Sequence, residues 1–537
     1  MTSSLPATAC NKTQRCCVSR SGSAWVEPAK TLEPQLVKLT PIENLCAHVY
    51  PSATVFLRIE QDQDILQRFE HLRQGLSRML YEIPILTGTL EQDARGAFSV
   101  RIPKAPDAGA RFHFLDLSGD DSFPTFEEIA QRGFPFANGS SDGLERLVVN
   151  DYPASEAGDP VSLWQLVHLK GGLMVVGSFT HMVGELILAH EYLHRWAKHS
   201  YDAAAAAHSG RPMPALAQYP ADTMDRTRLS PGDGKDIASP DEMKTRGSSF
   251  ENLKPINSDD LEGTMAELQN MMPKAHVLPH EMHRQDDLRK TTMGIWRFSP
   301  AQQKFLQKAA QETAPKDAKV SSVDALTAFL WQRFVVAKYT NALPTESSLV
   351  YAGNIRRRLN PPLPPNYLGA AVDLFRVKLP ASRLVARQGQ SPNQLLGDTA
   401  VMIRDSNSKW SEEQYMTLLE LSQRAPMAPG FVPRGPIDVL ATDHSRIGGI
   451  LTTEWGPGLS KPVSFREPYL GRDCPAGEIT IMPRWPNGDL EVMISGEVVT
   501  IERLCVDEQM KRMSAKVFIT HDVLAETRRS GALRARL

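Results

Sequence analysis

His181 stands where a run of apolar and small residues ends, and its imidazole can exchange a proton near neutral pH. The run Leu173–Thr180 is typical of a buried strand, and Glu185 follows the histidine four residues later. A strand end that opens into a turn lets an imidazole face a cleft while a neighbouring group fixes its tautomer. Glu185 also begins a helical pattern, where the helix dipole favours a carboxylate. A lone histidine on an apolar segment is usually a buried structural residue, but this position strengthens the case for His181 as a catalytic group.

A second histidine motif follows in the same helical pattern. His190, Glu191 and His194 match the HExxH pattern of zinc peptidases, in which both imidazoles share one helix face. The expected spacing for a third ligand holds Ser200 instead, and Arg195 places a permanent positive charge beside the site. The sequence therefore favours a histidine-rich helix without a metal over a zinc peptidase.

Composition excludes several other classes of function. The chain has 537 residues, with 60 Lys and Arg against 62 Asp and Glu, and no basic tract that would indicate a nucleic-acid partner. Its most apolar stretch, residues 171–189, is interrupted by polar side chains and is no membrane helix. Because the N-terminus lacks the apolar core of a signal peptide, we expect a cytoplasmic protein that does not bind a membrane.

The elements that must position these residues alternate between helix and strand in both halves, which predicts a mixed α/β class. Asp64 precedes an amphipathic pattern that Pro84 ends. Ser299 and Ser321 are typical helix caps in the second half. Near the C-terminus, two strand patterns flank Asn487-Gly488, a strong hairpin signal.

The length predicts more than one domain. We expect residues 1–30 to be a disordered leader and residues 31–208 to form an N-terminal domain that carries the HxxxE motif of His181. Residues 209–289 are polar and rich in Pro and Asp, which indicates a crossover between domains. Residues 290–537 would form the C-terminal domain.

Three motifs, taken in order, resemble those of the BAHD-type acyltransferases, in particular the fungal branch similar to trichothecene 3-O-acetyltransferases. Residues 181–185 lie where that family has HxxxD. Residues 354–364 look like its Asp-x-Arg-x-Arg-Leu…Pro-Pro-Leu-Pro segment, and residues 454–458 are similar to its Asp-Phe-Gly-Trp-Gly. Order and spacing agree from about residue 36 to 515.

The resemblance implies two acyltransferase domains of similar size, each a mixed sheet flanked by helices, arranged as in chloramphenicol acetyltransferase with a channel between them. The implied cosubstrate is acyl-CoA, most simply acetyl-CoA, and no cofactor is bound permanently. The implied acceptor is a small-molecule alcohol or amine of secondary metabolism. We expect a monomer.

The resemblance also implies roles for particular residues. His181 takes the proton of the acceptor, and Glu185 pairs with Arg356 or Arg358 to orient the histidine turn. Two further groups complete the expected site. The structural group is Glu454, Trp455, Gly456 and Gly458, and the candidate donors to the tetrahedral oxyanion are Thr442, His444 and Ser445.

The chain departs from the family pattern at Glu185 and Glu454, where the family has Asp, and at Leu186, where it has Gly. A carboxylate displaced by ~1 Å costs on the order of 100-fold in rate. The alternative function is therefore a member of the same fold that binds or reshapes a small molecule without acyl transfer. The lesser alternative is a zinc peptidase.

Overall fold

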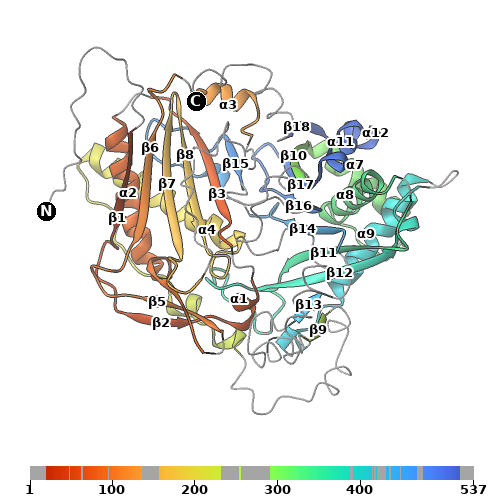
Figure 1. Cartoon of the computed structure of the whole chain (residues 1–537), viewed down its shortest axis with the longest axis horizontal. Helices are drawn as coiled ribbons and strands as arrows, with labels where there is room; N and C mark the ends of the chain where they lie inside the picture. The colour runs from red at the N-terminus through yellow and green to blue at the C-terminus, as the bar shows by residue number, and fades with distance from the viewer. Residues whose placement is uncertain are drawn as a thin grey trace.

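The structure is a computed structural model, and it shows two halves, each built on a mixed sheet with helices against it (Figure 1). The described residues are 20–46, 49–61, 64–94, 96–121, 123–135, 156–230, 253–255, 291–340, 342–386, 391–413, 415–416, 419, 431–433, 437–447, 449–467 and 476–519.

The first sheet carries the strand that leads to His181. Helices α2 (Ile65–Glu82) and α4 (Leu186–Ser209) pack against each other beside this sheet. The buried Trp164 and Trp196 rings meet edge to face between sheet and helix, 5.0 Å apart. In spatial order the strands are β1 (Arg20–Val26), β6 (Ala110–Asp116), β7 (Ser162–Leu169), β8 (Gly172–Phe179), β3 (Ser52–Arg58) and β15 (Ser464–Arg466).

The second sheet lies in the other half of the molecule, with its helices at the far side from the first sheet (Figure 1). Its strands, in spatial order, are β12 (Val372–Pro380), β11 (Glu346–Asn354), β14 (Val439–Asp443), β16 (Glu478–Ile481), β17 (Leu490–Glu497), β10 (Thr291–Phe298) and β18 (Ala515–Ile519). Its helices are α7 (Pro300–Thr313), α8 (Ser322–Lys338), α9 (Pro392–Ser408), α11 (Val498–Val506) and α12 (Glu508–Met513).

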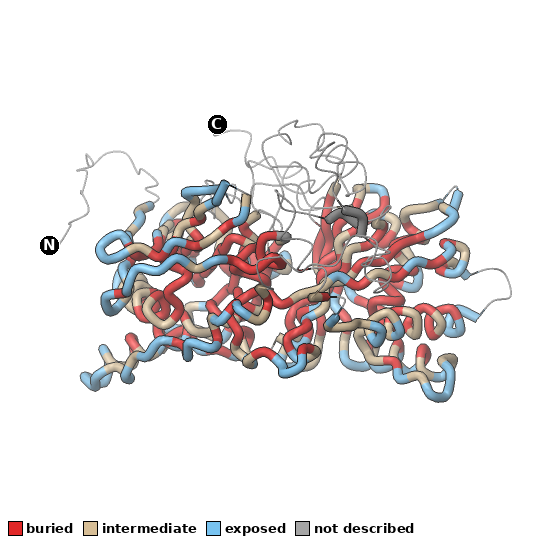
Figure 2. Tube along the Cα trace, turned by 90° about the horizontal axis from the view of Figure 1, so that it is seen from below, coloured by how far each residue is buried: buried red, intermediate tan, exposed pale blue. Residues whose placement is uncertain are grey.

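Smaller elements complete the described chain. They are α1 (Pro41–Leu45), α3 (Phe126–Gln131), a sheet of β2 (Gln35–Lys38), β5 (Phe98–Ile102) and β4 (Thr89–Gln92), and a pair of β9 (Leu253–Pro255) with β13 (Phe431–Pro433). Buried segments fill the interior of both halves (Figure 2). No helix in the described ranges is long and apolar enough to span a membrane.

Strand β15 joins the two halves, because it comes from late in the chain yet pairs with β3, with Phe465 opposite Val55 (Figure 1). The segment before β15 is also held by the first half, where Arg68 donates to the carbonyl oxygens of Pro457 at 3.3 Å and Gly458 at 3.4 Å. Residues 464–466 of the predicted C-terminal domain, 290–537, therefore extend the first sheet rather than the second. Apolar side chains of both sheets also meet in a shared buried cluster that includes Phe56, Val176, Met293, Ile295 and Met493.

Most local predictions are confirmed. Asp64 caps α2 by accepting from the backbone N–H of Leu66 at 3.0 Å, and Ser299 and Ser321 form capping boxes at α7 and α8. The Asn487-Gly488 turn joins the antiparallel strands β16 and β17. The disordered leader is wrong for residues 20–26, because β1 pairs with β6 there. Residues 1–19, and residues 231–252 and 256–289 of the predicted crossover, lie outside the described residues.

Trp455 gives a test of how the two halves are joined. Its ring is 2% exposed and meets the ring of Trp196 on α4 edge to face at 5.4 Å. We predict that Trp455→Ala lowers the free energy of unfolding by about 3–5 kcal/mol, because it leaves a cavity between the halves. Urea denaturation measures this change.

Trp25→Ala is the matched control, since that ring is 47% exposed and should cost about 1 kcal/mol or less. Equal losses for the two tryptophan variants would contradict the role assigned to Trp455.

Candidate functional site

His181 lies in a tight turn directly after β8. The turn is closed by a hydrogen bond from the N–H of Val183 to the carbonyl oxygen of Thr180 at 3.0 Å. The backbone N–H of His181 donates to the carbonyl oxygen of Val49 at 2.8 Å. The histidine side chain is partly buried, whereas Thr180 is fully buried. The predicted position of His181, at a strand end that opens into a turn, is confirmed.

Gly184 fixes the shape of this turn. A Cβ atom at that position would lie 2.5 Å from the Cβ of Phe179 and 3.1 Å from the carbonyl oxygen of Thr180, so only glycine fits. The hydroxyl of Tyr192 on α4 donates to the carbonyl oxygen of Val183 at 2.9 Å. The backbone around His181 is therefore held by contacts on both sides.

Glu185 forms a buried ion pair with Arg356, and their side chains are 10% and 6% exposed. The carbonyl oxygen of Glu185 accepts the first hydrogen bonds of α4, from Leu188 at 2.8 Å and Ala189 at 3.1 Å. Arg356 also donates to the carbonyl oxygen of Gly369 at 2.6 Å. The ion pair thus joins the start of α4 to the segment after the second motif.

Arg358, the other predicted partner of Glu185, lies elsewhere. Its guanidinium donates to the carbonyl oxygen of Asn407 at 2.7 Å and lies 5.0 Å from the ring centre of Phe375. The structure therefore selects Arg356 as the partner of Glu185.

A second buried ion pair was not predicted from the sequence. Arg226 donates to both carboxylate oxygens of Glu43, at 2.9 and 3.0 Å, and Glu43 is fully buried. Arg226 also donates to the carbonyl oxygen of Leu368 at 3.2 Å, and Glu43 accepts from the N–H of Ala370 at 3.3 Å. Glu43 also closes the capping box of α1 with Thr40, and the sequence shows this helix-start signal. Arg226 lies in a polar segment that carries no comparable sequence signal.

Of the candidate oxyanion donors, His444 interacts electrostatically with His181. Burial and the neighbouring His181 lower the pKa of His444 to about 3, so its imidazole is neutral near pH 7. Thr442 lies on β14, and Ser445 uses its backbone N–H to bind the carboxylate of Asp443 at 2.9 Å. The loop after β14 therefore places His444 beside the histidine turn.

His444 also comes close to two further groups, the buried His190 on α4 and the partly exposed Glu467 just after β15. Each offers a ligand atom within 4.8 Å of the other two. Burial lowers the pKa of His190 well below its ordinary value and raises the pKa of Glu467 to about 8. The sequence motif had singled out His190 but not the other members of this group.

The HExxH motif does not form the site that its pattern suggests. The Nδ1 atom of His194 lies 2.7 Å from the hydroxyl of Thr453, and Glu191 pairs with Arg195 at 2.8 Å. Among the residues that the structure describes, His194 is in no group of three metal-ligating side chains. The peptidase hypothesis therefore finds no support in the geometry.

The third motif lies against α4 and α2 rather than beside His181. Glu454 is 59% exposed and its carboxylate lies 4.0 Å from the ammonium of Lys461, whereas Trp455 is buried. Gly458 has φ +70°, a left-handed conformation that favours glycine, and Gly456 has φ +156°. These contacts fit the predicted structural group.

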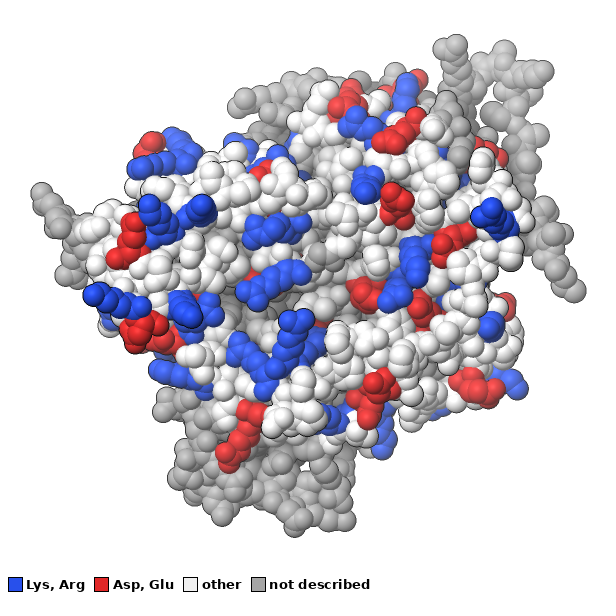
Figure 3. Space-filling model, turned by 180° about the vertical axis from the view of Figure 1, so that it is seen from behind, with Lys and Arg blue, Asp and Glu red and all other residues white. Residues whose placement is uncertain are grey.

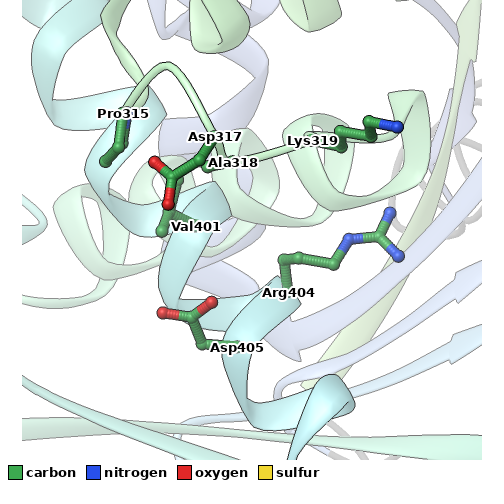
Figure 4. A pocket seen from close by; sticks show the side chains of 7 residues that line it. All are labelled: Pro315, Asp317, Ala318, Lys319, Val401, Arg404 and Asp405. Atoms are coloured by element: carbon green, nitrogen blue, oxygen red, sulfur yellow. The ribbon is translucent and has the colours of Figure 1, made fainter.

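A surface pocket of about 610 Å³ lies beside α9, and Figure 4 shows the side chains that line it. They include Asp317 and Lys319 from the loop after α7 and Arg404 and Asp405 from α9. Arg404 is already paired with Asp324 at 2.5 Å. The pocket contains none of the predicted site residues.

Comparison with known proteins gives one family match and several relatives along most of the chain. The Transferase family matches residues 235–419. Acyltransferase clz6 of Cochliobolus lunatus is 25% identical over 492 residues, which covers 90% of this chain and 95% of clz6. Acyltransferase M4 of a Phoma species is 24% identical over 503 residues, which covers 91% of this chain and 96% of M4.

Solved structures show the same fold. TRI101 of F. graminearum, solved with coenzyme A and T-2 mycotoxin, has a TM-score of 0.69 at 18% identity, covering 90% of this chain and all of TRI101. Vinorine synthase has a TM-score of 0.58 at 15% identity, covering 92% and 98% of the two chains. Together with the motifs, these matches confirm the resemblance to the BAHD-type acyltransferases.

Proposed function

We propose that this protein moves an acyl group from acyl-CoA to a small-molecule alcohol or amine, with His181 as the general base. The observation that carries the proposal is the rigid turn that presents His181, fixed by Gly184 and anchored through the Glu185–Arg356 ion pair. Positioning of this kind is what a general base needs, because misplacement by ~1 Å costs on the order of 100-fold in rate.

The proposed reaction needs only one proton-transfer group. The imidazole of His181 takes the proton of the acceptor as its oxygen or nitrogen attacks the thioester carbonyl carbon. The tetrahedral intermediate then expels the thiolate of CoA as the C–S bond breaks, and the imidazolium returns the proton to that sulfur. A general base contributes ~10²–10⁴ to the rate in such reactions.

The negative charge that develops on the carbonyl oxygen needs a hydrogen-bond donor. Thr442, His444 and Ser445 remain the candidate donors, and the proximity of His444 to His181 favours it. A neutral imidazole carries one N–H group and can donate it to the oxyanion.

Surface charge and the relatives indicate the acyl donor and the acceptor. Figure 3 shows Lys and Arg side chains gathered around a hollow near the middle of one face, which suits the phosphates of CoA. The fungal acyltransferases and the complex of TRI101 with coenzyme A and T-2 mycotoxin support an acyl-CoA donor, most simply acetyl-CoA, and a small-molecule secondary metabolite as acceptor. We also propose a cytoplasmic, monomeric enzyme.

The geometry favours acyl transfer over the alternative of a member of this fold that only binds or reshapes a small molecule. That alternative depended on Glu185, whose extra methylene was expected to shift the turn. Glu185 nevertheless reaches Arg356, and both residues stay buried. The carboxylate is therefore in place despite the departure from the family residue.

The role of His181 is tested by His181→Ala. We predict a loss of acyl transfer of ~10²–10⁴-fold or more with an unchanged melting temperature, because the imidazole is partly buried and replaceable without a large cavity. Turnover with acetyl-CoA and a panel of alcohols and amines, followed by release of free thiol, measures the effect.

His194→Ala is the matched control, and it should keep activity within a few-fold of wild type because the ring of His194 contacts the hydroxyl of Thr453 and not the His181 turn in the part of the chain that the structure describes. A His181→Ala enzyme with at least half the wild-type turnover would rule out the proposed base.

Glu185 is proposed as a positioning residue, and its variants separate that role from catalysis. Glu185→Ala leaves a buried guanidinium without its partner and should lower the free energy of unfolding by ~3–5 kcal/mol, as measured by urea denaturation. Neutralising the arginine as well, in Glu185→Ala with Arg356→Met, should recover part of that loss. Glu185→Asp keeps the charge and should retain measurable activity.

Glu70→Ala is the matched control, because it breaks the exposed Glu70–Arg73 pair and should hardly change stability. An inactive Glu185→Ala enzyme with an unchanged unfolding curve would show instead that Glu185 takes part in the reaction directly.

A further inference from the structure

The buried group of His190, His444 and Glu467 has polar atoms that the proposed reaction does not use. His190 is 3% exposed, and neither of its ring nitrogens has a hydrogen-bond partner among the residues that the structure describes. His444 is 7% exposed, and within the same part of the chain its Nδ1 is likewise without a partner, as is the buried Oε1 of Glu467. Buried polar atoms normally have partners, so these three side chains indicate a ligand.

The three side chains converge from separate parts of the fold. His190 comes from the second turn of α4, His444 from the loop after β14, and Glu467 from the residue after β15. Their ligand atoms lie within 4.8 Å of one another. The ring of Phe465 packs against the ring of His190 with centroids 4.7 Å apart, which gives the group an apolar wall. Glu467 is partly exposed, whereas both histidines are buried.

We propose that His190, His444 and Glu467 form a binding site for a divalent transition-metal ion, with Zn²⁺ the best fit. Two imidazole nitrogens and one carboxylate oxygen are a ligand set that zinc uses in proteins, with bonds of about 2.0–2.2 Å and a fourth position for water. A dication also neutralises the negative charge of the Glu467 carboxylate, whereas two neutral imidazoles do not.

The site differs from the HExxH pattern in which His190 lies. His194, the second histidine of that pattern, bonds Thr453, and the other ligands come from distant segments instead. A metal ion here joins α4 of the first half to the loop after β14 of the second sheet. We therefore expect bound metal to stabilise the folded chain, since a ligand that binds only the native state raises its stability.

The test uses the full-length protein, stripped with a chelator and dialysed. We expect isothermal titration with ZnCl₂ to give one site per chain, and elemental analysis after gel filtration to give about one zinc per chain. The melting temperature should rise on addition of about 0.1 mM ZnCl₂ and fall again with EDTA. Absence of zinc binding by folded wild-type protein at this concentration would overturn the proposal, and water would then be the partner of these atoms.

Two variants test individual ligands, and a third variant is the control. His444→Gln and Glu467→Gln should each weaken zinc binding at least about tenfold, because each removes one ligand. His194→Gln is the matched control from the same helix and should bind zinc as wild type does. Circular dichroism verifies that each variant is folded. If one variant does not fold, the zinc titration of the wild-type protein still tests whether the site exists. Loss of zinc in His194→Gln but not in His444→Gln would overturn the assignment in favour of the HExxH pair.

Discussion

Two buried ion pairs, Glu43–Arg226 and Glu185–Arg356, determine where the histidine turn lies relative to the rest of the molecule. Each guanidinium also donates to a backbone carbonyl in residues 368–370, at 3.2 and 2.6 Å. Removing four charges from water is costly, and only good geometry with additional hydrogen bonds compensates for that cost. Both pairs bind the same short segment, residues 368–370. Helix α1, the turn after β8 and the segment after β11 are therefore fixed relative to one another.

The two halves depend on each other in the same way. Strand β15 extends the first sheet although it follows most of the second sheet in the chain, and Trp455 packs on Trp196 just before it. The loop after β14 then brings His444 from the second sheet to the turn of the first. A site at such a junction exists only when both halves are folded and docked.

Features that depend on local spacing were predictable from the sequence. The caps at Asp64, Ser299 and Ser321, the strand before His181 and the Asn487-Gly488 turn each leave a signal within a few residues. Strand β15 leaves none, because it is short and its pairing partner lies some 400 residues away in the chain. The first strand, RSGSAWV, escaped prediction because small and polar residues carry its pairing with β6. Arg226 and Glu467 became neighbours of the site through tertiary structure alone.

The substitution of Glu for Asp at position 185 shows which property of that residue the turn requires. The turn is fixed on one side by Gly184 against Phe179, and on the other by the first hydrogen bonds of α4 to the carbonyl oxygen of Glu185. The backbone is therefore not free to move when the side chain lengthens. The carboxylate still meets Arg356, whose long side chain has several rotatable bonds and ends on the carbonyl oxygen of Gly369. The adjustment thus falls on the arginine. The geometry thus keeps a carboxylate at the start of α4, and the flexible side chain of Arg356 spans the distance to it.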